Sequence, residues 1–494
     1  MLECSGPRNW RGLRPGDSAA VQAHSQFRGL LVGICQRIKE AGANVYLYCG
    51  NKEEKKFYDD NYPELFNEVI VAAHLYKQYS DIKAEKDLYD EARKLEAQLG
   101  TTYNEILIND RHFGRGFSVG GYYHPRSRMS EERNYLQIVA ATNSTLKFWL
   151  AEFEAKKISI CLNFGRLPNV VARSLGIPVR IPTLLRYEDR YYWAYDEQQQ
   201  SPRIAKQFAI SKPDENVRFK GAYNAYKSFR EKIKGRVGVH VFAGRAALTI
   251  LRFAYWKLRR YEKAKGYYLK ELVTYHWRQR QATNEMMSGA LPGLEDLEGK
   301  RFIFFPLSTE PESLQTLSPE YFYQLAFITS IARDLPVGVY LVVKEHLAAV
   351  GRRPKDFYGQ IMEFKNVIMA NIQEDGIALM RRSEAVAIIT GTSGLEAAVS
   401  GKPILTYGRQ NIYNFLPHVS VIKEETELKE ALHRVTSGGI DLEKARHDGE
   451  KLLKALVDIS FPLKSFSPWK PDIIDEQDIS IAYDTLLETA GEED

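Results

Sequence analysis

A short polar stretch rich in glycine, Gly391-Thr392-Ser393-Gly394, is the part of the sequence best suited to bind an anion. It follows an apolar run at 385–389 with the length of a buried strand, and it precedes a short helical segment at 395–400. Backbone N–H groups and hydroxyls of such a loop can approach a phosphate, and the positive end of the helix dipole points at the same place. A tight turn in which Thr392 or Ser393 only caps the helix is the alternative interpretation.

Two further predicted strands, upstream of this loop, also end in polar residues. The strands are expected at 301–305 and 337–343. The first leads to Glu310 and Glu312, and the second leads to Lys344 and His346. Ligands of an open parallel sheet bind at the carboxyl ends of its strands. We therefore expect these side chains and the glycine-rich loop to face one crevice.

The order of these motifs resembles that of the bacterial capsular polysaccharide biosynthesis proteins. Over about residues 300–410 the chain has Pro-Leu-x-x-x-Pro-Glu, then Val-Lys-Glu-His, then Gly-Thr-Ser-Gly-x-Glu-Ala with Gly-Lys-Pro. These proteins are GT-B-fold glycosyltransferases that include β-Kdo transferases and are related in architecture to bacterial sialyltransferases. The chain departs from the family pattern at Leu347, where proline is frequent, and at Glu310, where glutamine is frequent.

The resemblance implies transfer of a sugar from a nucleotide-activated donor, with a CMP-sugar such as CMP-Kdo favoured, to a growing capsular or other cell-surface polysaccharide. Lys344, His346, Thr392 and Ser393 would then stabilise the charge on the departing phosphate. Glu396 would orient the loop or hold a ribose hydroxyl. A sugar-nucleotide epimerase with the same fold is one alternative, and a non-catalytic binding protein of capsule assembly is the other.

The predicted fold class is α/β and GT-B-like, with two Rossmann-like domains that face a cleft. We expect an N-terminal acceptor-side domain at 1–290, a nucleotide-sugar-binding domain at 299–465, and a segment at 466–494 that crosses back to the first domain. Residues 1–25 contain no apolar run typical of a first buried strand. That strand is therefore expected to lie outside this chain, or the start codon to be misplaced.

The catalytic base is predicted in the N-terminal domain. An inverting enzyme of this fold needs a carboxylate or an imidazole to deprotonate the acceptor hydroxyl. Asp110 is our choice, with His112 as a substitute, because both follow a predicted strand at 105–108. A structural ion pair between Asp110 and Arg111 is the alternative. The resemblance implies no metal and no cofactor, and the sequence shows no Asp-x-Asp pair that would hold a metal–diphosphate.

A basic and aromatic insertion is predicted at about 221–285. Residues 221–280 contain 15 Lys or Arg against three Glu, whereas the net charge of the whole chain is only +5. Such a composition suits an anionic membrane surface or the pyrophosphate of a lipid-linked glycan acceptor. Nucleic acid would suit it too, but no nucleic-acid-binding module lies beside it in the sequence, and we predict none as a partner. A solvated helical pair with its aromatic residues in the core is the structural alternative.

The location expected is cytoplasmic, with peripheral binding to the inner face of the plasma membrane. Residues 1–16 lack the apolar region of a secretory signal, and no apolar run reaches the roughly 18 residues that span a bilayer. The four cysteines show neither zinc-ligand spacing nor a disulfide pattern, which favours a reducing compartment.

Overall fold

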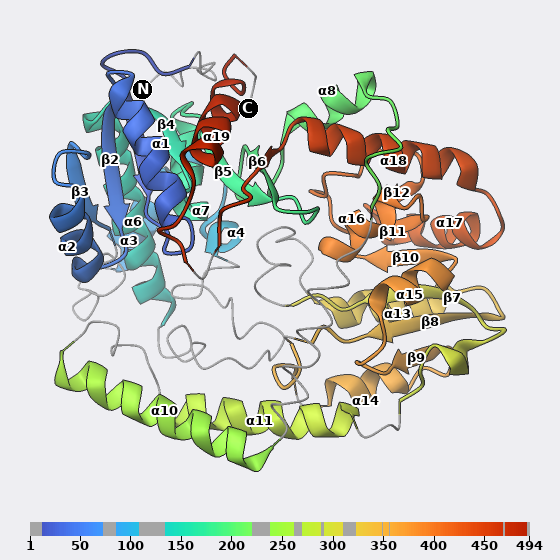
Figure 1. Ribbon diagram of the computed structural model, residues 1–494. Helices are drawn as coiled ribbons and strands as arrows, with labels where there is room; N and C mark the ends of the chain where they lie inside the picture. The colour runs from blue at the N-terminus through green and yellow to red at the C-terminus, as the bar shows by residue number, and fades with distance from the viewer. Residues whose placement is uncertain are drawn as a thin grey trace. The chain divides into compact units, whose positions relative to one another are not determined.

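The computed structural model describes residues 12–72, 85–107, 134–219, 238–260, 269–287, 291–309, 323–347, 349–354, 356–467 and 470–491. Contacts divide the chain into two compact units (Figure 1). The first combines residues up to Leu107, residues from Arg133 to Ala209 and residues from Leu456 on, and the second contains Ile210–Ala455. Asp110, His112, Glu310 and Glu312 lie outside the described residues.

The first unit is built on a seven-stranded sheet in the order β13-β6-β5-β4-β1-β2-β3. Five strands are parallel: β1 (Ser18–Gln22), β2 (Asn44–Cys49), β3 (Glu68–Val71), β4 (Ile158–Leu162) and β5 (Val179–Leu184). Beyond β5 the sheet is extended by β6 (Arg190–Ala194), antiparallel to β5, and by β13 (Phe461–Pro462), antiparallel to β6. The helices are α1 (Arg28–Glu40), α2 (Lys52–Asn61), α3 (Glu85–Leu99), α4 (Tyr103–Leu107), α6 (Tyr135–Ala155), α7 (Arg166–Ser174), α8 (Pro202–Ile210) and α19 (Glu476–Leu487).

Strand β1 shows that the prediction of a missing first strand is wrong. It lies between β2 and β4 in the middle of the sheet, and Ala19, Ala20 and Val21 have no exposed area. Its sequence, Ser-Ala-Ala-Val-Gln, contains a single β-branched residue. Small side chains fill this central position, so the strand lacks the apolar, β-branched run by which buried strands are recognised.

The strand predicted at 105–108 is also wrong, because residues 103–107 form the short helix α4. Tyr103, Ile106 and Leu107 are its buried side chains, and their spacing is that of one helical face. The hydroxyl of Thr102 accepts a hydrogen bond from the N–H of Glu105 at 3.2 Å, which supports the first turn. The apolar residues were too few to distinguish a short strand from a helical turn.

The second unit is built on a six-stranded parallel sheet in the order β12-β11-β10-β7-β8-β9. The strands are β7 (Arg301–Pro306), β8 (Val339–Lys344), β9 (Val367–Ala370), β10 (Ala385–Ile388), β11 (Ile404–Thr406) and β12 (Val419–Val421). The chain starts in the middle at β7, moves outward through β8 and β9, and returns to the other side of β7 as β10. This is the doubly wound order of a Rossmann-like domain, with its switch point between β7 and β10. The predicted class, α/β with two Rossmann-like domains, is confirmed; the cleft between them stays a prediction.

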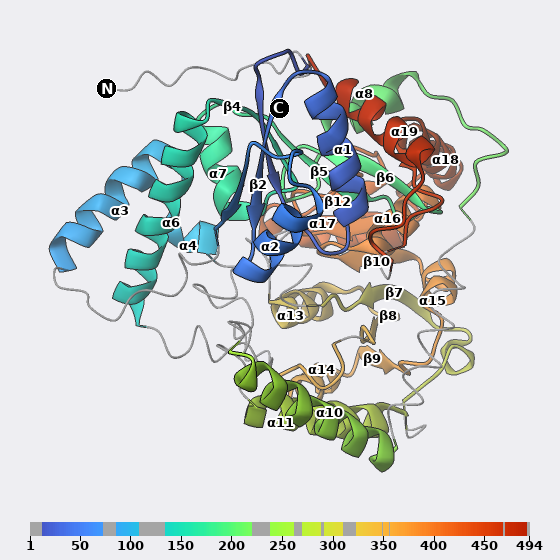
Figure 2. The same cartoon turned by 60° about the vertical axis from the view of Figure 1, so that its left-hand side comes forward.

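Helices cover this second sheet (Figure 2). They are α13 (Gln324–Asp334), α14 (Phe357–Met362), α15 (Gly376–Arg382), α16 (Thr392–Val399), α17 (Glu425–Thr436) and α18 (Leu442–Asp458). Ile303 and Phe305 of β7 share one buried cluster with Ile328 of α13, Ile361 of α14 and Leu428 of α17. None of the helices that the structure describes is long and apolar enough to cross a membrane.

The basic insertion contains two long helices, α10 (Val239–Leu258) and α11 (Leu269–Met287), that contact each other. Our sequence-based boundary places them in the N-terminal domain, whereas the contacts group them with the second unit. Met286 belongs to the core of that unit, and the hydroxyl of Tyr275 accepts a hydrogen bond from Arg352 at 2.8 Å. A Cβ on Gly351 would lie 2.5 Å from Cα of Gln279, so this glycine allows α11 to approach the backbone that follows β8.

Candidate functional site

The loops that follow β7, β8 and β10 are joined by hydrogen bonds at the switch point of the second sheet. Ser308, after β7, donates its hydroxyl to the carbonyl of Thr390 after β10 at 2.9 Å. Thr309 Oγ1 lies 2.9 Å from Nδ1 of His346, which follows β8. Lys344 at the end of β8, His346 after it and the glycine-rich loop therefore lie at one edge of the sheet, as predicted from the sequence.

The glycine-rich loop begins with a residue that requires glycine. Gly391 has φ of 123°, a conformation that L side chains rarely adopt, and it is the N-cap of α16. The helix therefore begins at Thr392, three residues before the start expected from the sequence. Because the cap has no side chain, the alternative in which Thr392 or Ser393 caps the helix is wrong. Thr392 and Ser393 are half-buried in the first turn, where the N–H groups of a helix can bind an anion.

The last glycine of the loop, Gly394, serves packing. A Cβ at this position would lie 1.9 Å from the hydroxyl oxygen of Tyr413 and 2.7 Å from its Cζ. Tyr413 is buried, burial raises its pKa, and among the described residues its hydroxyl has no hydrogen-bond partner. Gly394 was predicted as a donor-binding residue, and its geometry gives it this structural role irrespective of any ligand.

We expect Gly394→Ala to lower the free energy of unfolding by about 1–3 kcal/mol, the usual cost of overpacking a buried site. Tyr413→Phe alone should be neutral or slightly stabilising, because it removes a buried hydroxyl that lacks a partner among the described residues. Combined with Gly394→Ala, it should restore part of the loss. Urea denaturation of the four proteins measures this. Equal losses with and without the tyrosine hydroxyl would show that the Gly394–Tyr413 contact is not what requires glycine.

A buried ion pair fixes the loop after β8. Glu345 has no exposed area, and Arg353 donates to its two carboxylate oxygens at 2.8 and 2.9 Å. The hydroxyl of Tyr358 and the N–H of His346 donate to the same carboxylate, at 2.7 and 2.5 Å. Burial by itself would raise the pKa of Glu345, but the charge and hydrogen bonds of Arg353, with those of Tyr358, outweigh it and lower that pKa. Glu345 is therefore ionised at neutral pH.

This ion pair connects two of the site loops and was not predicted from the sequence. Arg353 also donates to the carbonyl of Ser308 at 2.9 Å, so the loops after β7 and β8 share one guanidinium. Glu345 lies between two residues that were predicted to bind the donor. The sequence around Glu345 gave no sign that its side chain points inward. Its pairing with Arg353, eight residues later, depends on the turn between the two residues.

His346 is neutral at pH 7. His346 is exposed at the surface of the described residues, yet the protein atoms around the ring lower its pKa to about 4, chiefly by desolvation. Glu345 opposes this shift, while Lys344, Arg352 and Arg353 reinforce it. When Thr309 donates its hydroxyl to Nδ1, the single ring proton resides on Nε2 and can be donated to a ligand. His346 therefore suits a neutral hydrogen-bond donor better than a positive charge.

Lys344 and Glu396 were also predicted to bind the donor, and Lys402 belongs to a motif of the predicted resemblance. Lys344 is buried as the last residue of β8, and its carbonyl accepts a hydrogen bond from Leu307 at 2.9 Å. Glu396 is half-buried in α16. Lys402 of the Gly-Lys-Pro motif donates to the carbonyls of Arg381 and Ser383, so this lysine supports the connection before β11 rather than a ligand.

A buried amide, also missed from the sequence, holds the end of β10. Asn411 donates to the carbonyls of Ile389 and Gly408, both at 3.0 Å, and lies 2.9 Å from the hydroxyl of Thr406. That hydroxyl donates to Ile389 as well, at 3.1 Å. These bonds satisfy backbone groups where the strand ends and thereby fix the start of the glycine-rich loop. No pattern in the sequence distinguishes Asn411 from an ordinary loop residue.

The first unit has a switch point of its own, between β1 and β4. Asn163, after β4, donates to the carbonyl of Gln22 at 3.1 Å, and the N–H of Gly165 donates to the Gln22 side chain at 3.0 Å. The exposed His24 follows β1 at the same edge. No candidate residue was predicted at this switch point, because the sequence of β1 lacks the pattern of a buried strand. Among the described residues no group of His, Cys, Asp or Glu is arranged to hold a metal ion.

Comparison with known proteins adds a family match and remote structural likenesses. A search of the curated proteins found no match. Among solved structures, a UDP-GlcNAc 2-epimerase from Neisseria meningitidis bound to UDP-GlcNAc is 11% identical, with 90% of this chain and 98% of that chain covered and a TM-score of 0.25. A glycosyltransferase from Rickettsia africae is 10% identical, with coverage of 96% and 99% and a TM-score of 0.29. The calicheamicin glycosyltransferase CalG4 is 11% identical, with coverage of 90% and 95% and a TM-score of 0.25. Likenesses at this level carry no argument about activity.

The family match is more specific. The model described as capsule polysaccharide biosynthesis protein matches residues 244–416, from within α10 to beyond the glycine-rich loop. This region includes every motif on which the predicted resemblance rests. Over residues 244–416 the chain therefore matches the capsule polysaccharide biosynthesis protein family, and the predicted resemblance is confirmed.

Proposed function

We propose that this protein is a metal-independent glycosyltransferase of the GT-B type that adds a sugar from a nucleotide donor to a capsular or other cell-surface polysaccharide. The observation that carries the proposal is the set of joined loops at the switch point of the second sheet, where Gly391 opens α16 beside the ends of β7 and β8. The family match over 244–416 supports the same class of reaction.

In the proposed reaction the acceptor hydroxyl attacks the anomeric carbon while the bond from that carbon to the donor phosphate breaks. The electron pair of that bond goes to the phosphate oxygen, so negative charge grows there. The N–H groups of the first turn of α16, the hydroxyls of Thr392 and Ser393, and the N–H of His346 would stabilise this charge. Lys344 would add a positive charge to the same edge. Asp110, or His112 in its place, is proposed to take the proton of the acceptor hydroxyl.

We further propose a CMP-sugar such as CMP-Kdo as the donor, and a thermal-shift measurement with CMP, CDP, UDP, GDP and dTDP tests this. A ligand that binds only the native state raises its stability by mass action, by about 2.7 kcal/mol at a concentration of 100 Kd. CMP or CDP should raise the Tm most. The double variant Thr392→Val, Ser393→Ala should lose most of this shift, whereas Ser400→Ala, at the other end of α16, should keep it. A clearly larger shift with UDP or GDP would contradict the CMP-sugar assignment.

Turnover assays separate the proposed transferase from the two alternatives. A transferase consumes donor at a rate that depends on the acceptor. An epimerase with the same fold would convert the nucleotide sugar when no acceptor is present. A protein that binds nucleotide without measurable hydrolysis, epimerisation or transfer would be a binding protein of capsule assembly.

A further inference from the structure

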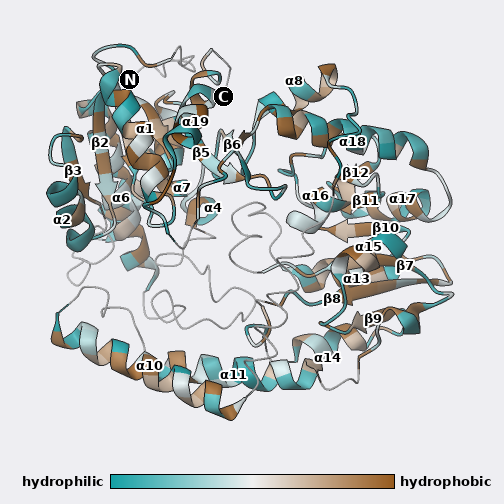
Figure 3. Cartoon of the chain, viewed as in Figure 1, coloured by the Kyte–Doolittle hydropathy of each residue, from teal (hydrophilic) through white to brown (hydrophobic). Residues whose placement is uncertain are grey.

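Helix α10 exposes an apolar stripe although it packs against α11. It has no buried residue over its 20 residues. Leu248, Leu251, Tyr255 and Leu258 are exposed by 54, 65, 49 and 83% of their area. At about 100° per residue these four side chains fall within an arc of about 80°, so they form one continuous row along the helix. Figure 3 shows apolar segments along α10.

The opposite side of α10 is fixed by α11. Phe242 and Trp277 pack edge to face, with ring centroids 5.3 Å apart. Through Met286 and Tyr275, α11 is attached to the core of the second unit and to the loop after β8. Because α11 occupies the opposite side of α10, the stripe faces outward. An outward apolar row of this kind marks a binding surface.

A row of arginines borders the stripe. Arg245, Arg252 and Arg259 are seven residues apart, which places them on one side of the helix, between the stripe and the face that contacts α11. Residues 239–260 contain no Asp or Glu. The guanidinium of Arg259 lies 5.9 Å from the ring centroid of Tyr255, so this arginine stacks on a member of the stripe. Positive charge beside an outward apolar row complements an anionic bilayer, where lipid phosphates border the acyl chains.

We propose that α10 lies in the headgroup region of an anionic lipid bilayer, with Leu248, Leu251, Tyr255 and Leu258 inserted toward the acyl chains and the arginine row on the lipid phosphates. Long basic side chains can extend toward the phosphates while their stems stay on apolar surface. Charge alone already suggested a membrane role, and the apolar stripe adds insertion to it. This inference rests on the proposed function in one respect: the bilayer is where the transferase would meet a lipid-linked acceptor.

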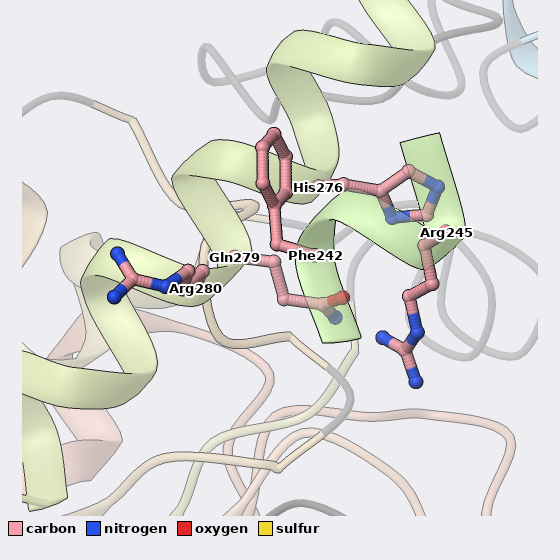
Figure 4. A pocket seen from close by; sticks show the side chains of 5 residues that line it. All are labelled: Phe242, Arg245, His276, Gln279 and Arg280. Carbon is pink, nitrogen blue, oxygen red and sulfur yellow. The ribbon is translucent and has the colours of Figure 1, made fainter. Parts of the chain in front are cut away.

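A single phosphate-binding pocket accounts less well for the arginines of α10 and α11. A small hollow between the helices is lined by Phe242, Arg245, His276, Gln279 and Arg280. Figure 4 shows Gln279 between the two arginines, whose guanidinium groups point to opposite sides of it. Arg280 instead lies over the ring of Trp277, at 5.4 Å from the centroid. The arginines therefore suit contacts with separate headgroups along a surface rather than one clamped phosphate.

Apolar insertion makes a prediction that charge alone does not. Electrostatic attraction should fade as the Debye length falls from about 10 Å at 0.1 M salt to about 3 Å at 1 M, but apolar burial persists. We expect the full-length protein to sediment with phosphatidylglycerol-containing vesicles at low salt and to keep part of that binding at 1 M salt. Vesicles of phosphatidylcholine alone should bind it less.

Two triple variants and a matched control test the proposal by vesicle sedimentation. The leucine variant carries Leu248→Ser, Leu251→Ser and Leu258→Ser. It should reduce partitioning at least about tenfold at both salt concentrations, since each substitution removes an apolar side chain that loses water on insertion. Arg245→Gln, Arg252→Gln, Arg259→Gln should reduce it mainly at low salt. The control, Val337→Ser, Leu442→Ser, Ile473→Ser, changes exposed apolar residues elsewhere and should bind like the wild type.

The proposal is overturned if the wild type ignores anionic vesicles at low salt, or if the leucine variant binds as the wild type does. It is also overturned if the wild type is a dimer in solution that binds no vesicles and the leucine variant is a monomer, because a second copy would then cover the stripe. Nucleotide-induced thermal shifts, measured on the same proteins, should be unchanged. Vesicle binding without any nucleotide effect would reject the proposed transferase and leave the membrane contact standing.

Discussion

Arg353→Leu should lower the free energy of unfolding by about 3–5 kcal/mol, the usual cost of removing one partner of a buried ion pair. The substitution leaves the carboxylate of Glu345 without exposed area and without its bidentate partner. It also removes the donor to the carbonyl of Ser308, which joins the loops after β7 and β8. Urea denaturation at pH 7 measures the change.

Two further proteins show whether the buried pair is the cause. Arg333→Leu removes an exposed arginine of the same domain that pairs with half-buried Asp334 and exposed Glu425, and it should cost at most about 1 kcal/mol. The double variant Glu345→Leu, Arg353→Leu should recover much of the loss, because no unpaired charge remains buried. If Arg353→Leu were no more costly than Arg333→Leu, the pair would not stabilise the site.

The same pair should make stability depend on acid. The folded-state pKa of Glu345 is lower than its ordinary value of about 4.3. The stability that ionised Glu345 contributes is therefore fully present at pH values above its ordinary pKa. It is lost as the pH falls through the folded-state pKa, where the carboxylate takes up a proton. Stability of the wild type should fall in that acidic window, and the double variant should fall less.

His346→Ala should lower transfer by about 10²-fold or more, the scale of one positioned donor to a developing negative charge. The Tm should barely change, because His346 is exposed at the surface of the described residues. His433→Ala, at an exposed histidine of α17, is the matched control and should leave transfer unchanged. A loss of folding with full activity per folded molecule would make His346 a structural residue.

The state of the imidazole gives this prediction a second readout. Because the pKa of His346 is lowered to about 4, the ring is neutral from pH 5 to 8. The activity lost in His346→Ala should therefore be the same across that range, with no titration near the ordinary histidine value of about 6.5. A dependence on His346 that grows below pH 7 would indicate a charged ring.

What could be predicted from the sequence depended on local pattern. Strand β10 and the loop after it were predicted because an apolar run ends at a glycine, and the motif there is one of those that carry the resemblance confirmed over residues 244–416. Strand β1 was missed because small residues carry little periodicity. The roles of Glu345 and Asn411 were missed for another reason. Each depends on partners that turns of the chain bring close, and residue spacing does not predict the path of those turns. Lys402 shows the converse, a motif residue that has a structural role.

The first domain is completed by the last part of the chain. Strand β13 adds to its sheet beside β6, and Ile479 of α19 packs so closely on α1 that a Cβ at Gly33 would lie 2.5 Å from it. Arg180, fully buried, donates to the hydroxyl of Thr489 at 2.9 Å. During synthesis on a ribosome, most of the second domain is therefore available to fold first, and the first domain waits until the segment from residue 456 has been made. Deletions after residue 456 should accordingly act as lesions of the N-terminal core.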